Sequence, residues 1–115
     1  MKVIIAGSRN FNDYKTLCKY CDYILQNENN IEIICGMAKG ADLLGKKYAE
    51  EKNYPLHKFP ADWNRYGKSA GYIRNKEMGK NADALICFWD QKSKGTKNMI
   101  NIAKELKIKY RIFYF

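Results

Sequence analysis

Five short apolar runs alternate with segments of helical periodicity along this 115-residue chain. Each run is rich in β-branched or aromatic residues and is bounded by turn residues, as buried strands are. We expect strands at residues 3–6, 31–35, 54–59, 84–89 and 110–115. Strands that alternate with helices form parallel pairs through right-handed crossovers. The alternation therefore predicts an α/β fold, a single Rossmann-like three-layer sandwich with a mostly parallel sheet of about five strands.

Helical periodicity fills the segments between these runs. From Leu17 to Leu25, apolar residues recur at spacings of three and four, which indicates one face of a helix that Asn12 or Asp13 would cap. Three further helical patterns follow, one ending near Asn53, one running from Ser69 through Met78 and one starting close to Thr96. The helices thus separate the expected strands, as parallel pairing requires.

Length and composition predict one domain that covers residues 1–115. With 46% hydrophobic residues the chain can bury one core, and it is too short for two domains. No apolar stretch approaches the roughly 20 residues of a membrane span. Met1 leads into an apolar run without the features of a signal peptide. We therefore expect a cytoplasmic protein with no membrane partner.

The four cysteines are consistent with that compartment. Cys35 and Cys87 fall in predicted strands, where a free thiol packs as a small apolar side chain. Cys18 and Cys21 form one Cys-x-x-Cys pair in a helical pattern, and no second Cys or His pair completes a zinc site. We expect neither a metal nor a cofactor, and the sequence assigns no role to Cys18 and Cys21.

Basic residues outnumber acidic ones by 21 to 12, for a formal net charge of +9. Such an excess fits a nucleic-acid partner, an anionic small molecule or a solvated surface. Most of it is lysine spread over helix faces rather than an arginine-rich stripe. Charge alone therefore favours the solvated surface and leaves the other two readings open.

Glycine-containing turns stand at three expected strand-to-helix junctions, at residues 7–9, 36–42 and 93–96. A helix N-terminus presents unpaired N–H groups and partial positive charge, and glycine lets an anion approach that backbone closely. In a parallel sheet such junctions share the carboxyl edge. The turns therefore predict a site for a phosphate-bearing ligand. Its candidate residues are Gly7, Ser8, Arg9, Gly36, Gly40, Ala41, Asp42, Ser93, Gly95 and Thr96.

The connection at residues 59–75 is long and crowded with aromatic and charged side chains. Loops of this length are uncommon unless they build a site. One of three aromatic rings could stack on a base, with packing within the domain as an equal alternative for one or two of them: Trp63, Tyr66 and Tyr72. Arg65, Lys68 and Arg74 could meet phosphate. Asp62 is expected either to accept a ribose hydroxyl or to serve the local structure.

Six short motifs occur in one order between Gly7 and Met99. They are Gly-Ser-Arg-x-Phe-x-Asp, Gly-x-Ala-x-Gly-Ala-Asp, Pro-Ala-Asp-Trp, Gly-Lys-x-Ala-Gly, Arg-Asn-x-x-Met and Ser-x-Gly-Thr. The succession resembles the YspA and YpsA-related branch of the SLOG superfamily. The resemblance implies a Rossmann-like fold with a nucleotide or nucleotide-derived ligand, bound by the first two motifs. Relatives include the LOG phosphoribohydrolases and the DprA single-strand DNA-binding proteins.

The chain departs from the LOG pattern in both of its signatures, and the first glycine pair of the LOG Pro-Gly-Gly-x-Gly-Thr-x-x-Glu motif is missing at residues 91–99. Arg74 matches an arginine implicated in LOG catalysis and is the one catalytic candidate, whereas Asn75 replaces the lysine that follows it. Both residues are also expected to bind the ligand. Met99 stands where the LOG enzymes carry a glutamate that assists cleavage of the N-glycosidic bond. A thioether can neither stabilise an oxocarbenium-like state nor protonate a leaving base. The sequence therefore favours binding over hydrolysis.

Three functions follow from these observations. The favoured one is a bacterial or phage sensor or sequestering protein that binds an ADP-ribose or cyclic-nucleotide type of ligand at the carboxyl edge of the sheet. The alternatives are a LOG-like nucleoside 5′-monophosphate phosphoribohydrolase and a DprA-like protein that binds single-stranded DNA. Residues 110–115 are apolar enough to be an edge strand that pairs with a second copy, with burial inside the monomer as an equal alternative. The resemblance to SLOG enzymes, which commonly dimerise, favours a homodimer.

Overall fold

The computed structural model describes residues 1–115 and contains one sheet of five strands. The strands are β1 (Lys2–Gly7), β2 (Glu32–Cys35), β3 (Leu56–Lys58), β4 (Ala84–Trp89) and β5 (Lys109–Tyr114). Their order is β3-β2-β1-β4-β5, and every neighbouring pair is parallel. The expected α/β, Rossmann-like sheet is therefore confirmed.

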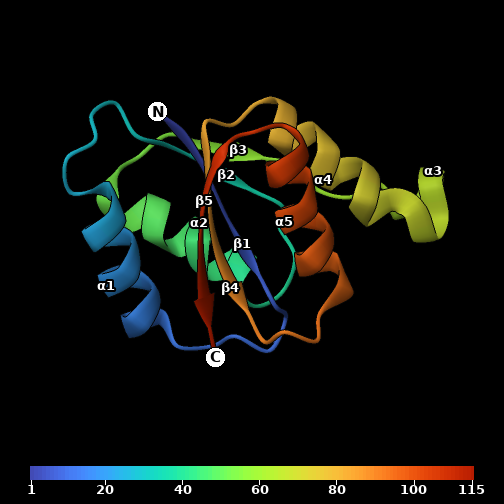
Figure 1. Ribbon diagram of the computed structural model, residues 1–115, viewed down its shortest axis with the longest axis horizontal. Helices are drawn as coiled ribbons and strands as arrows, with labels where there is room; N and C mark the ends of the chain where they lie inside the picture. The colour runs from blue at the N-terminus through green and yellow to red at the C-terminus, as the bar shows by residue number, and fades with distance from the viewer.

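Helices cover both faces of the sheet, which Figure 1 shows nearly edge-on. One face carries α1 (Tyr14–Leu25) and α2 (Ala41–Lys52), and the other carries α4 (Ala70–Lys80) and α5 (Lys94–Glu105). The chain leaves β1 toward the first layer and β4 toward the second, although these two strands are neighbours. A crevice therefore lies between their carboxyl ends, where open α/β sheets bind ligands.

Alternate residues of β1 face the two layers of the core. Val3 and Ile5 pack with residues of α1 and α2, whereas Ile4 and Ala6 pack with residues of α4 and α5. All four are buried, because β1 lies at the centre of the sheet between two helical layers. This packing holds the residues that follow β1 at a defined point of the sheet edge.

Local signals set the ends of the helices. Asp13 is the cap of α1, since its Oδ1 accepts the Thr16 N–H at 3.1 Å. α2 ends at Lys52 and is capped by Asn53, which has a left-handed φ of 58°. Ser93 caps α5, so this helix begins at Lys94, slightly before the start expected from the sequence.

A short helix α3 (Trp63–Tyr66) and a 3₁₀ turn η1 (Gly67–Ser69) precede α4. Neither was expected from the sequence, because one helical turn is too short to show a periodicity. Asp62 caps α3, with its Oδ1 accepting the Arg65 N–H at 3.2 Å. Figure 1 shows α3 protruding from the sandwich on the side opposite α1. No helix of the structure is long and apolar enough to cross a membrane.

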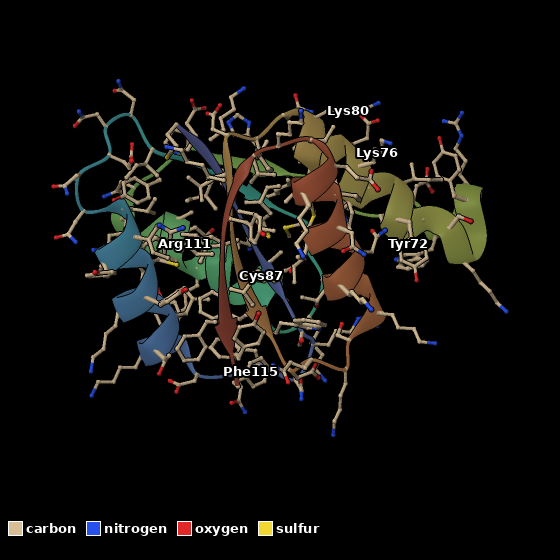
Figure 2. The ribbon with its side chains drawn as sticks, viewed as in Figure 1. Tyr72, Lys76, Lys80, Cys87, Arg111 and Phe115 are labelled. Carbon is tan, nitrogen blue, oxygen red and sulfur yellow. The ribbon has the colours of Figure 1, made fainter.

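The cysteines are all free thiols, and Cys35 and Cys87 are buried in their strands as expected. Figure 2 shows Cys87 at the centre of the molecule, on β4. Burial raises the pKa of the Cys87 thiol to about 12, so this group is uncharged and unreactive at neutral pH. Cys21 is buried in α1 beside the half-buried Cys18.

β5 is an edge strand, one of the two alternatives that the sequence left open, and it pairs only with β4. Tyr114 and Phe115, at its carboxyl end, are exposed. Figure 2 shows Phe115 at the end of β5, and its ring meets that of Phe11 at a centroid distance of 4.9 Å. Pairing of this edge with a second copy stays a prediction.

Candidate functional site

Two glycines let the chain segments at the sheet edge approach each other. A Cβ on Gly7 would collide with the carbonyl oxygen of Phe88 and lie 2.9 Å from the Cβ of Ala41. Gly40 has a φ of 88°, and a Cβ there would lie 2.5 Å from the carbonyl oxygen of Ser8. These glycines therefore allow the end of β1 to meet both β4 and the start of α2.

Ser8 fixes the turn between β4 and α5. The Oγ of Ser8 donates to Oδ1 of Asp90 at 3.1 Å. Oδ1 of Asp90 also accepts the N–H groups of Lys92 at 2.9 Å and Ser93 at 2.8 Å. The backbone N–H of Ser93, ahead of the other donors, lowers the pKa of Asp90. Ser8 is thus buried, and its hydroxyl holds the turn at Asp90 that forms one side of the site.

A cavity of about 190 Å³ opens at the carboxyl ends of β1 and β4. Ten of the residues predicted from the sequence line it: Gly7, Arg9, Asp42, Trp63, Lys68, Arg74, Asn75, Ser93, Gly95 and Thr96. A second cavity, of about 250 Å³, adjoins it and is lined by Gly36 and Lys39. The two cavities share Arg9, Ala38, Trp63 and Arg74. The other four candidates, Ser8, Gly40, Ala41 and Asp62, line neither cavity.

Arg74 stands between the two cavities and is held by the backbone of two strand ends. Its Nη1 donates to the carbonyl oxygen of Gly36 and, at 3.4 Å, to that of Phe59. Its Nε donates to Oδ1 of Asn75 at 3.0 Å, while Nη2 has no hydrogen-bond partner in the protein. Burial lowers the pKa of the guanidinium, which nonetheless stays charged at neutral pH. Arg74 therefore offers fixed, unused donors to a ligand.

Asn75 joins α4 to the first turn of α5. Its Nδ2 donates to the carbonyl oxygen of Gly95 at 3.3 Å and to Oδ1 of Asn98 at 3.0 Å. Its own Oδ1 accepts from Arg74, so every polar atom of this amide has a protein partner. Asn75 is only 6% exposed and orients Arg74 relative to α5.

Asp42 is the single acidic residue that lines either cavity. Its Oδ2 accepts the N–H of Ala38 at 3.2 Å, and no cation lies within ion-pair distance of its carboxylate. Burial raises its pKa to about 6, against the opposing effect of Arg74 and, more weakly, of Arg9. The side chain is 4% exposed, so its charge is poorly solvated.

The floor of the first cavity is apolar. Met78 and Met99 line it, and each belongs to the core cluster between the sheet and helices α4 and α5. Met99, which replaces the LOG glutamate, is 1% exposed. No carboxylate therefore stands at the position that the LOG motif would supply.

The outer wall comes from α3, η1 and the first turn of α4. Trp63 is 50% exposed and Tyr72 is 47% exposed, although both line the first cavity. Figure 2 shows Tyr72 on α4, near α3 and clear of the sheet. Tyr72 is one of the three rings that the sequence offers for stacking, whereas Gly71 and Lys39 line the cavities without having been singled out as ligand-binding residues. The Gly-Lys-x-Ala-Gly and Gly-x-Ala-x-Gly-Ala-Asp motifs, which adjoin or contain these residues, were the available signal.

These features define a Rossmann-like α/β domain with a cationic cavity at the carboxyl edge of its sheet. Residues 1–66 match the family described as the YspA, cpYpsA-related SLOG family. The chain is also 31% identical over 114 residues to the Gene 61 protein of Mycobacterium phage D29, an alignment that covers 93% of this chain and 91% of that protein. The chain belongs to the YspA, cpYpsA-related SLOG family.

The fold is similar to that of a larger solved protein. DNA processing protein A from Helicobacter pylori, whose structure was reported for its single-stranded DNA binding mode, superposes with a TM-score of 0.69 at 17% sequence identity. The match covers 97% of this chain and 64% of that one, so this chain spans just under two thirds of its structural neighbour. At this identity the likeness shows a shared fold.

Proposed function

We propose that this chain binds a nucleotide or a nucleotide-derived small molecule, of the ADP-ribose or cyclic-nucleotide kind, as a sensor or sequestering protein. The observation that carries the proposal is the cavity where Arg9, Lys68 and Arg74 meet the carboxyl ends of β1 and β4. Cations at this point of an open α/β sheet are suited to a phosphate-bearing ligand. The SLOG family membership supports the same class of ligand.

The first turn of α5 is suited to the phosphate group. The N–H groups of Lys94 and Gly95 have no hydrogen-bond partner in the protein, as expected for the start of a helix. A Cβ on Gly95 would meet no atom within 4 Å, so the backbone is open to an approaching anion. Arg74 supplies the unused Nη2 donors from another wall of the same cavity. Helix terminus and guanidinium together favour an anion between them.

The aromatic outer wall is suited to the base. Trp63 and Tyr72 line the cavity, yet about half of each side chain is exposed. Burying such rings against a planar base gains apolar contact without disturbing the core of the protein. The cavity thus places phosphate-binding groups and stacking groups on different walls.

Cleavage of the sugar–base bond is an alternative function of the same cavity. The reaction passes through an oxocarbenium-like state, which requires a nearby carboxylate or an acid for the leaving base. Met99 provides neither, and Asp42 is the one acidic residue that lines the cavity. A phosphoribohydrolase would depend on Asp42 and Arg74, so binding without turnover is favoured.

Single-stranded nucleic acid is a second candidate ligand, favoured by the surface of α3 and η1. Trp63 and Tyr66 are exposed there, and the Arg65 guanidinium lies 5.0 Å from the centre of the Tyr66 ring. Exposed rings among cations stack unpaired bases with little sequence preference. This function requires that affinity for an oligonucleotide falls steeply with added salt, and weak or salt-insensitive binding would exclude it.

The deciding experiment is incubation of the purified protein with AMP, NMN, ADP-ribose and cyclic nucleotides, followed by mass spectrometry of the bound and the free fractions. We expect an intact nucleotide in the bound fraction and unchanged nucleotides in the free fraction. Release of free base and ribose phosphate would establish the phosphoribohydrolase instead. Absence of any retained nucleotide would contradict the proposed function. In the same assay, Arg74→Ala should retain less nucleotide than the wild type. Arg65→Ala is its control, because Arg65 lies outside both cavities.

A further inference from the structure

Asp42 is a buried charge without a cationic partner. It is 4% exposed, lines the first cavity and makes no ion pair. A carboxylate offers about four lone-pair positions, and the Ala38 N–H occupies one of them at 3.2 Å. The backbone N–H of Gly7 also lies close enough to lower the pKa of Asp42. Burying a charge is costly unless hydrogen-bond donors surround it. The remaining acceptor positions of Asp42 therefore favour a ligand that brings donors of its own.

The carboxylate lies close to the cationic group that would bind phosphate. A Cβ built on Gly36 would lie 2.7 Å from Oδ2 of Asp42 and 2.7 Å from Nη1 of Arg74, so the two groups flank the same point at the end of β2. A ligand held here must place an anionic group at Arg74 and hydrogen-bond donors at Asp42. A ribose phosphate carries both within one sugar unit.

We infer that Asp42 accepts hydrogen bonds from ribose hydroxyl groups and makes the cavity selective for ribonucleotides over 2′-deoxyribonucleotides. This inference rests on the proposed nucleotide-binding function and adds the class of sugar. From the sequence, Asp62 was the residue expected to accept a ribose hydroxyl, and the inference gives this role to Asp42 instead. Asp62 lines neither cavity, and its carboxylate caps α3 instead.

The other polar groups of the cavity do not duplicate this role. Arg9, Lys68 and Arg74 are donors only, and both polar ends of the Asn75 amide are occupied by protein partners. The hydroxyl groups of Ser93 and Thr96 bond to each other, and Ser93 Oγ also accepts the Thr96 N–H. A carboxylate also repels phosphate, so Asp42 excludes a ligand that presents only anionic oxygens to it. Asp42 is therefore the one charged acceptor that the cavity offers to sugar hydroxyl groups, beside the uncharged hydroxyl groups of Ser93, Thr96 and Tyr72.

Isothermal titration of matched pairs tests the inference. The probes are AMP against 2′-deoxy-AMP, the corresponding GMP, CMP and UMP pairs, and ADP-ribose against its 2′-deoxy analogue. Each pair keeps base and phosphate constant, so only the sugar hydroxyl differs. For pairs that bind, we expect the ribonucleotide to bind at least tenfold more tightly, or about 1.4 kcal/mol.

Two variants assign the selectivity to a residue. In Asp42→Asn, which keeps the size of the side chain, we expect the ratio of ribo to deoxy affinity to fall toward one while deoxynucleotide affinity is kept or improved. Asp62→Asn is the matched control and should keep the wild-type ratio. Circular dichroism of each variant confirms that it is folded.

The outcomes separate the inference from the function on which it rests. Equal affinity of the wild type for both members of every binding pair would overturn the role of Asp42 and leave nucleotide binding intact. An unchanged ratio of ribo to deoxy affinity in a folded Asp42→Asn protein would also overturn the role of Asp42 and leave nucleotide binding intact. Failure of every probe to bind would overturn nucleotide binding itself, and the inference with it.

Discussion

The two walls of the cavity differ in how firmly the fold holds them. The sheet wall, formed by Gly7, Asp42, Arg74 and Asn75, is closely packed and hydrogen-bonded to strand ends and to α5. The aromatic arm, residues 62–72, is largely exposed, and α3 protrudes from the sandwich (Figure 1). The groups proposed to bind phosphate are therefore held in place by the fold, whereas the rings proposed to meet the base have few packing contacts to hold them.

Gly7→Ala should have the largest effect, because it acts on the packing of the sheet wall. The added Cβ would collide with the backbone of β4, which cannot move without breaking the sheet. We expect a loss of about 3 kcal/mol or more in the free energy of unfolding, measured by urea denaturation. Gly95→Ala is the control, since its Cβ would meet open space and should leave stability nearly unchanged. Equal stability of the two variants would show that the wall is not closely packed.

Asp42→Asn should stabilise the same wall at neutral pH. The pKa of Asp42 rises from 3.8 to about 6 on folding, so the folded state binds the proton more tightly and loses stability as pH rises through that window. Two pKa units correspond to about 3 kcal/mol. The variant should therefore gain up to that amount at pH 7.5 and little at pH 4. A difference in melting temperature that does not vary with pH would contradict the burial of a charged Asp42.

Arg74→Ala should weaken nucleotide binding by about 30-fold, or about 2 kcal/mol. The substitution removes the unused donors and also the contacts to Gly36 and Phe59, so a thermal melt must accompany the titration. Arg65→Ala removes a guanidinium outside both cavities and should leave affinity unchanged. Equal losses in the two variants would mean that net charge, rather than the sheet wall, attracts the ligand.

Trp63→Ala, in the aromatic arm, should lower the affinity for a nucleotide and hardly change stability, whereas Gly7→Ala is expected to lower stability. We expect affinity for a nucleotide to fall about tenfold, through loss of stacking, with less than about 0.5 kcal/mol change in stability. Tyr66→Ala is the matched control, because this exposed ring lines neither cavity. A large loss of stability in Trp63→Ala would show that the arm is part of the packed structure.

The sequence predicted the sheet wall better than the arm. The strands follow from apolar runs, and the glycine turns meet at one edge because parallel strands end there. Hydrogen bonds between residues far apart in the chain leave no pattern in the sequence, so they could not be predicted from it. The partners of Asn75 are Gly95 and Asn98 on α5, which only the packing of α4 against α5 brings near.

The roles of the acids show the same limit. Asp42 and Asp62 both follow glycine-rich or loop segments, and nothing in their sequence neighbours separates a buried carboxylate from a helix cap. In the structure, Asp42 lines the cavity near Arg74 and Asp62 caps a four-residue helix. That helix has no periodicity to detect, so the fold of the arm, and with it the position of Asp62, required the structure.

Chemical-shift mapping tests the location of the site most directly. A ¹H–¹⁵N spectrum of the labelled protein would be titrated with the nucleotide retained in the incubation experiment. The account predicts shifts at Gly7, Gly95 and the Trp63 indole, around the carboxyl edge of the sheet, and none at Glu28 or Tyr110, which line a separate cavity between α1 and β5. Shifts confined to that separate cavity, or to no part of the carboxyl edge, would contradict the proposed site.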